Sequence, residues 1–145
     1  MTALSIAIVV FIVLESLNVL TLYFNPGSQL GNGLGVFDAW ERAQADPEMK
    51  LFVQYLVNWV AGTKLIFIAL LWVILLAAPA STQLLTVVAM IGSISSFFWR
   101  LYPIIRTLDR DDHISPHGYS RILAMMITGF MGLFAAALGW SLFVA

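Results

Sequence analysis

The segment from Leu65 to Trp99 contains no Asp, Glu, Lys or Arg. An α-helix needs about 20 apolar residues to cross the roughly 30 Å hydrocarbon core of a bilayer, so this segment is long enough for parts of two crossings. Ala78-Pro79-Ala80-Ser81 divides it, because proline disfavours continuation of the helix before it. The segment therefore predicts two membrane-spanning helices that are joined by a tight turn and form an antiparallel hairpin.

The composition of the whole chain supports a membrane protein. Hydrophobic residues make up 61% of its 145 residues and charged residues 10%, against about 45–50% and 25% in soluble domains. A soluble domain of this size exposes too much surface to hide that excess, so the chain needs lipid as its solvent. It has room for one domain. The net charge of −1 gives no indication of nucleic acid as a partner.

Two further apolar segments complete an all-α, multi-pass fold with four transmembrane helices in an antiparallel bundle. Asp46-Pro47 and Ser115-Pro116 each place an N-capping residue before a proline, which is typical of helix starts. Apolar and polar residues around Trp40 alternate as in a short helix that lies at the membrane surface. We expect helices over about 3–24, 47–78, 82–106 and 116–144, with loops over 25–46 and 107–115.

Basic residues predict the orientation of the bundle. Apart from Lys64, all of them lie in or beside the first and third loops, and neither terminus nor the turn near Pro79 carries one. Cytoplasmic loops of membrane proteins are enriched in Lys and Arg. We therefore expect the first and third loops in the cytoplasm and both termini on the non-cytoplasmic side. The basic residues are Arg42, Lys50, Arg100, Arg106, Arg110 and Arg121.

Two ionisable residues, Glu15 and Lys64, lie deep in apolar segments, where a charge costs roughly 2.5–3.5 kcal/mol. At 1.5 Å per residue, both lie about 14 Å inside the membrane on consecutive antiparallel helices, so they are plausible partners. An intramembrane polar site is predicted from them and from the amides of Asn18, Gln54 and Asn58. It is either a structural ion pair, a transport or ligand site, or a contact with another subunit.

Other residues indicate contacts with lipid or with neighbouring helices. Arg100, Tyr102, Arg106 and Arg110 are candidates for contact with a lipid head group or another anion. Small residues four apart allow helices to pack closely. They occur in the third expected helix as Gly92 and Ser96, and in the fourth as Gly132 with Ala136 and Ala135 with Gly139.

The third loop contains five potential metal ligands, but their spacing is weak evidence for a metal site. Zinc, manganese and iron accept carboxylate and imidazole ligands. Pro116 and Gly118 keep the two histidines from sharing one helix face, so no metal and no other cofactor is predicted, only bound lipid. The candidates are Asp109, Asp111, Asp112, His113 and His117.

No set of a nucleophile and a base, and no phosphate-binding glycine loop in its usual context, indicates an enzyme. We therefore expect a non-catalytic membrane protein that acts as a packing or assembly subunit of a membrane complex or of a homo-oligomer. Its partners would be lipids and other membrane subunits. The alternative is a homo-oligomeric transporter or channel for a small solute or ion that uses Glu15 and Lys64. The third possibility is a lipid-modifying enzyme with its polar residues in the third loop.

Overall fold

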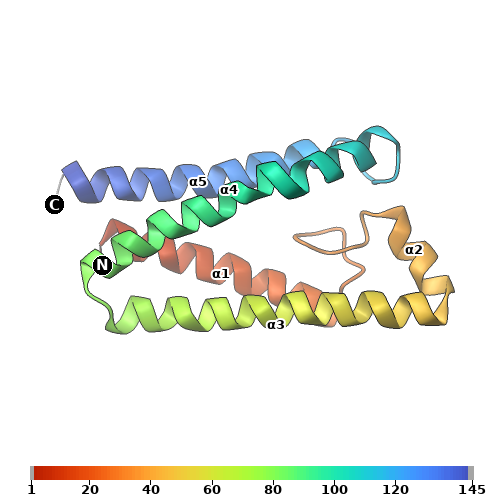
Figure 1. The fold of residues 1–145 in the computed structure, drawn as a ribbon, viewed down its shortest axis with the longest axis horizontal. Helices are drawn as coiled ribbons and strands as arrows, with labels where there is room; N and C mark the ends of the chain where they lie inside the picture. The colour runs from red at the N-terminus through yellow and green to blue at the C-terminus, as the bar shows by residue number, and fades with distance from the viewer. Residues whose placement is uncertain (1, 144–145) are drawn as a thin grey trace.

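A computed structural model describes residues 2–143 and contains, within them, five α-helices and no strand beyond an isolated β-bridge. Four helices are long and apolar enough to cross a membrane, so the predicted all-helical class is confirmed. Figure 1 shows them as a bundle with the short helix α2 at one end. Their bounds are α1 Ala3–Phe24, α2 Asp38–Ala45, α3 Pro47–Ala77, α4 Ala80–Arg110 and α5 Tyr119–Phe143.

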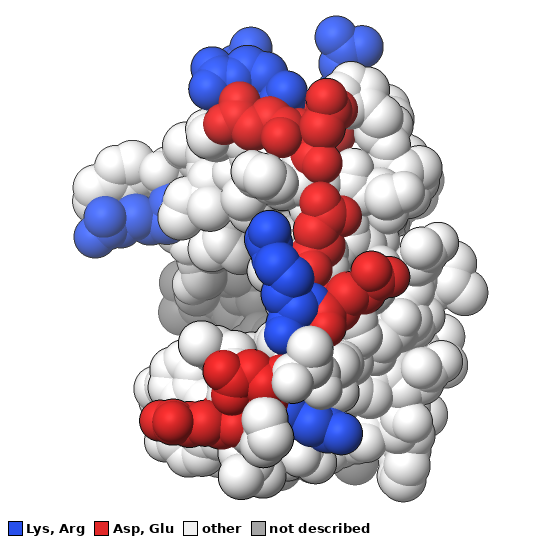
Figure 2. Space-filling view, turned by 90° about the vertical axis from the view of Figure 1, so that its right-hand side faces the viewer, with Lys and Arg blue, Asp and Glu red and all other residues white. Residues whose placement is uncertain are grey.

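The two ends of the bundle differ in chemistry. One end, the turn end, holds the start of α1, the turn between α3 and α4, and the end of α5 (Figure 1). The other, the charged end, holds α2 and the segments 25–37 and 111–118. Figure 2 views the charged end and shows acidic and basic side chains interspersed over it. At 1.5 Å per residue the 31 residues of α4 extend about 46 Å, so its last turns at this end project beyond the hydrocarbon core.

Helix α1 lies at the centre of the bundle. Buried residues make up 39% of its apolar span, against 11–17% in the other three. Its Phe11 is buried, and its ring centroid lies 6.0 Å from that of Phe67 of α3, and 5.4 and 5.5 Å from those of Phe130 and Phe134 of α5. The core is therefore organised around one helix that contacts all three other spans.

Helices α3 and α4 are joined by the expected tight turn, but they do not pack along their length as a hairpin. The main partner of α3 is α1, and the main partner of α4 is α5. Figure 1 shows α3 and α4 meeting near the turn and separating toward the charged end. At the turn end, buried Gln83 of α4 accepts a hydrogen bond from Ser5 Oγ of α1, at 2.9 Å, and thereby ties α4 to the central helix.

At the charged end, the segment that precedes α2 is hydrogen-bonded to the segment that follows α4. Phe37 and Ile114 form an antiparallel β-bridge, with hydrogen bonds from Asp38 N to His113 O (3.1 Å) and from Ser115 N to Val36 O (2.8 Å). Val36 and Ile114 are buried with Phe97 and Ile105 of α4 in a second apolar cluster. These segments were expected as parts of two separate loops; in the structure residues 25–37 and 111–118 form one unit, here called the cap.

Local signals at helix starts were right in one case and wrong in the other. The Asp46 side chain accepts hydrogen bonds from the amides of Glu48 and Met49, and Pro47 begins α3 as expected. In contrast, α5 begins at Tyr119, not at Pro116. The physical reason is that its first amides are capped by a side chain from α4, Asp109, rather than by Ser115.

Candidate functional site

The structure pairs Glu15 of α1 with Lys64 of α3, as their equal depth suggested. Nζ of Lys64 lies 2.5 Å from Oε2 of Glu15, and the two side chains are 22% and 14% exposed. Neighbouring residues on α3 explain the close approach of the helices: Ala61 is fully buried, and at Gly62 a Cβ atom would meet only Tyr23 Oη of α1, at 3.6 Å. Two charges that would each be costly in lipid thus neutralise each other inside the bundle.

The ion pair forms part of the wall of a mostly apolar cavity of about 380 Å³, here called the central cavity. It lies where α3 and α4 separate, so that one side is formed by Val60 and Lys64 of α3, and the other by Leu101 of α4 and its neighbours. Asn32, Gly33 and Phe37 of the cap border it at the charged end. Binding sites for small molecules are commonly concave and mostly apolar, with a few polar groups that converge on one point.

Lys64 also borders a second space, the outer hollow, on the outside of α3. This hollow measures about 370 Å³ and is lined by Lys64, Val60, Trp59, Thr63 and Phe67. Val60 and Lys64 therefore separate the central cavity from the outer hollow and belong to both. Since Trp59 and Val60 are 63% and 48% exposed, the outer hollow opens away from the bundle, toward lipid in a membrane.

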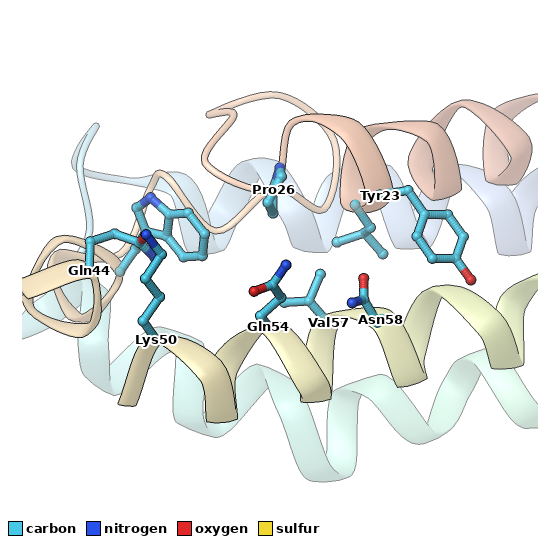
Figure 3. Close-up of a pocket in the computed structure, with 9 residues that line it drawn as sticks. Tyr23, Pro26, Gln44, Lys50, Gln54, Val57 and Asn58 are labelled. Carbon is cyan, nitrogen blue, oxygen red and sulfur yellow. The ribbon is translucent and has the colours of Figure 1, made fainter. Parts of the chain in front are cut away.

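The three amides that were expected to join the ion pair lie elsewhere. Gln54 and Asn58 line a separate pocket of about 190 Å³ between α1, α2 and α3, where their side chains point toward Pro26 and Tyr23 (Figure 3). They are one turn apart on α3, whereas Lys64 lies roughly 120° around the helix from Asn58. The predicted polar stripe is thus divided between two faces of α3.

Asn18 faces the cap, not the ion pair. Its Oδ1 lies so close to Gly31 that a Cβ atom there would be 2.5 Å away, and Gly31 has a φ of +60°. A residue with a side chain at position 31 would meet both a steric and a conformational penalty. Tyr119 Oη also donates a hydrogen bond to the Gly31 carbonyl, at 3.1 Å. Asn18 and Gly31 therefore fix the position of the cap on α1.

The candidates for head-group contact also separate. The Arg100 guanidinium lies 4.9 Å from the ring of Trp99, and Tyr102 packs against Phe97 and Phe98. Arg106 and Arg110, in contrast, line a hollow of about 370 Å³ at the charged end together with Arg121 and His117. Arg121 was not among the predicted head-group contacts, although its position beside the third loop indicated that it could join them.

Asp109 has a structural role at the charged end. It lies beyond the apolar part of α4, and its carboxylate accepts hydrogen bonds from Gly118 N (2.8 Å), Ser120 N (3.0 Å) and Ser120 Oγ (2.5 Å). Burial alone would raise the pKa of Asp109, but these hydrogen bonds outweigh it and hold the pKa below its ordinary value. The Asp109 carboxylate is therefore a negatively charged N-capping group for α5.

The remaining potential metal ligands do not converge. His117 Nδ1 lies 3.4 Å from Asp112 and 3.7 Å from Asp109, whereas His113 Nδ1 lies 3.8 Å from Asp38. Asp111 is bound to Arg110, with Oδ1 3.0 Å from Nε. Across residues 2–143 no three His, Asp or Glu side chains are grouped so that they could hold a metal ion.

Comparisons with protein-family models, with curated proteins and with solved structures found no match to this chain.

Proposed function

We propose that this protein is a non-catalytic membrane subunit that assembles with copies of itself through the outward face of α5. The observation that supports the proposal is a face of small side chains that nothing in residues 2–143 covers. Gly129, Gly132 and Ala136 are exposed on one side of α5. A Cβ atom at either glycine would have no neighbour within 4 Å, so no described helix uses this face.

Small residues are characteristic of contacts between transmembrane helices. Lipid tails are as apolar as leucine, so helices associate by close packing, which glycine and alanine permit. The same face on two copies can meet across a two-fold axis, because each copy then offers and receives the same contact. Met125 and Trp140, 66% and 63% exposed, lie at the two ends of this face and would border the contact.

The large exposed surface of the bundle is a second observation that supports assembly. The structure exposes 9150 Å², whereas a compact soluble monomer of 16.0 kDa exposes about 7,400 Å². In three of the four spans, at most 17% of the residues of the apolar window are buried. Additional copies would cover part of that surface, and within each copy the Glu15–Lys64 pair would fix which faces of α1 and α3 meet.

Cysteine crosslinking in membranes tests this proposal. The chain contains no cysteine, so every disulfide must involve the introduced residue. Ala136→Cys should form a disulfide-linked dimer on mild oxidation. Ala69→Cys is the matched control, since Ala69 is also an exposed alanine within a spanning helix, but on α3. Ala136→Leu should remove the dimer seen by native mass spectrometry, and Ala69→Leu should not. Equal crosslinking at both positions, or a monomer throughout, would contradict the proposal.

We also propose that the charged end faces the cytoplasm, with both termini on the other side. The six Lys and Arg residues outside the deep apolar segments lie toward this end, and basic residues favour the cytoplasmic side.

A further inference from the structure

Lys64 has hydrogen-bonding capacity that the chain does not use. Its ammonium group carries three N–H donors. In residues 2–143 one acceptor, Oε2 of Glu15, lies within hydrogen-bond distance. The Lys64 side chain is 22% exposed and lines both the central cavity and the outer hollow. A further acceptor can therefore approach its ammonium group from these spaces.

The unused N–H donors of Lys64 favour a ligand that carries a hydrogen-bond acceptor. The walls around Lys64 are mostly apolar, and a hydrogen bond left unmade in such surroundings is costly. The lipid that surrounds the bundle offers no hydrogen-bond partner in its hydrocarbon region. A molecule that brings an oxygen atom to Nζ of Lys64 would satisfy a donor that the described chain leaves free.

A groove that suits an apolar chain lies next to the outer hollow. A groove of about 440 Å³ lies between α3 and α4 on the side of the turn end, lined by Phe67, Leu71, Ile74, Met90 and Ile94 among others. Phe67 belongs to this groove and to the outer hollow, and Lys64 belongs to the outer hollow and to the central cavity. Polar and apolar binding regions thus follow one another along α3.

The net charge of the Glu15–Lys64 pair determines whether a charged or a neutral acceptor fits beside it. Lys64 and Glu15 neutralise each other, so a carboxylate ligand would add an unpaired negative charge in a medium of low dielectric constant. A carbonyl oxygen accepts the same hydrogen bond without adding charge. A neutral head group with a carbonyl is therefore the better complement to the pair.

We propose that this protein binds a lipid-soluble molecule with one apolar chain and a neutral carbonyl head group, such as a quinone. The carbonyl oxygen accepts a hydrogen bond from Lys64 in the outer hollow, and the chain runs past Phe67 into the groove between α3 and α4. The ligand enters sideways from the membrane, toward which the outer hollow opens. This site is separate from the proposed contact between copies, because none of Gly129, Gly132 and Ala136 lines the outer hollow, the central cavity or the groove.

Titration with three probes of similar chain length tests the proposal on the full chain in phosphatidylcholine nanodiscs. The probes are 2-decyl-1,4-benzoquinone, decylbenzene, which has no acceptor, and undecanoic acid, which adds a carboxylate. Calorimetry with protein-free nanodiscs subtracted gives each Kd. We expect the quinone to bind about tenfold or more tightly than either other probe, because a hydrogen bond to a charged group is among the stronger ones.

Two variants with matched controls locate the site. Glu15→Leu with Lys64→Met removes the donor without leaving an unpaired charge, and Lys50→Met controls for loss of a lysine on the same helix. Val60→Trp fills part of the outer hollow and changes neither member of the ion pair. Val73→Trp, also exposed on α3 but outside the three spaces, is its control. Quinone affinity should fall about tenfold in both test variants and stay unchanged in both controls.

Three results would overturn the proposal. Decylbenzene that binds as tightly as the quinone would show that the acceptor is irrelevant. Undecanoic acid as the tightest probe would contradict the neutral head group. Val60→Trp with the affinity of Val73→Trp would show that the probe does not occupy this space, whether or not the double variant folds.

Discussion

At the scale of single residues, the two most informative side chains are Lys64 and Asp109. The partner of Lys64 could be predicted from the sequence, because helix rise converts position into depth and few charges occur at that depth. The partners of Asp109 could not be predicted. They lie across a turn at Gly118 and Ser120, and no sequence spacing shows that the chain folds back there.

The first prediction concerns the ion pair. Lys64→Met should lower the free energy of unfolding by about 1–3 kcal/mol, because it leaves Glu15 without its cation in a largely buried position. Adding Glu15→Leu should restore most of the loss. Reversible unfolding in mixed detergent micelles measures both, with Lys50→Met as control. Full stability of Lys64→Met alone would exclude a structural role for the pair, and a stable double variant without solute uptake would favour the transport alternative.

The second prediction concerns pH. The pKa of Asp109 is lower in the folded than in the unfolded protein, so its contribution to stability is present above the ordinary pKa of about 3.9 and is lost as pH falls through the folded value. Asp109→Asn should lower stability at neutral pH by about 1–2 kcal/mol, because the amide keeps one acceptor oxygen and leaves a buried or part-buried donor of Gly118 or Ser120 without its partner. Thermal unfolding from pH 7 to pH 2 should therefore show a smaller acid-induced decrease in Tm for Asp109→Asn than for the wild type. Asp112→Asn, at an exposed position, should follow the wild-type curve.

At the scale of helices and loops, apolar length identified all four spans, and the Asp46-Pro47 pair identified the start of α3. These signals are local, so one sequence is sufficient to find them. The start of α5 and the pairing of Phe37 with Ile114 depend on contacts between distant segments. The division of Gln54 and Lys64 between different spaces depends on the neighbours of each face of α3, which periodicity alone does not supply.

The third prediction tests the attachment of the cap to α1. Gly31→Ala should destabilise the protein by about 1–2 kcal/mol, because Gly31 has a positive φ and a Cβ atom would collide with Oδ1 of Asn18. Gly92→Ala is the control, since a Cβ atom there has open space and alanine favours the helix. Unfolding midpoints should therefore move in opposite directions. A neutral Gly31→Ala would show that the cap is not held in this conformation.

At the scale of the whole molecule, composition was sufficient for the fold class but not for the arrangement. Each spanning helix is apolar on most of its circumference, so the sequence does not show which face is buried. The central place of α1 and the separation of α3 from α4 are consequences of side-chain packing, such as the contacts around Phe11 and the hydrogen bond between Ser5 and Gln83.

The fourth prediction concerns orientation. Single cysteines at Gln29, in the cap, and at Ser81, at the turn end, are both at exposed positions. With the charged end in the cytoplasm, a membrane-impermeant maleimide should label Ser81→Cys in intact cells, and it should label Gln29→Cys only after the membrane is opened. The reverse pattern would contradict the proposed orientation, and labelling of both in intact cells would show that the chain inserts in two orientations.

The β-bridge between Phe37 and Ile114 gives the connecting segments a mechanical role. Helices α3 and α4 share one short covalent joint near Pro79, while at their far ends they are tied together through the cap. The two helices are thus connected at both ends, by a short turn at one end and by a hydrogen-bonded pair of segments at the other. The separation of α3 from α4 at the charged end therefore depends on the segments that form the cap. A change in the length of these segments should alter the packing between the two helices without any substitution in a helix.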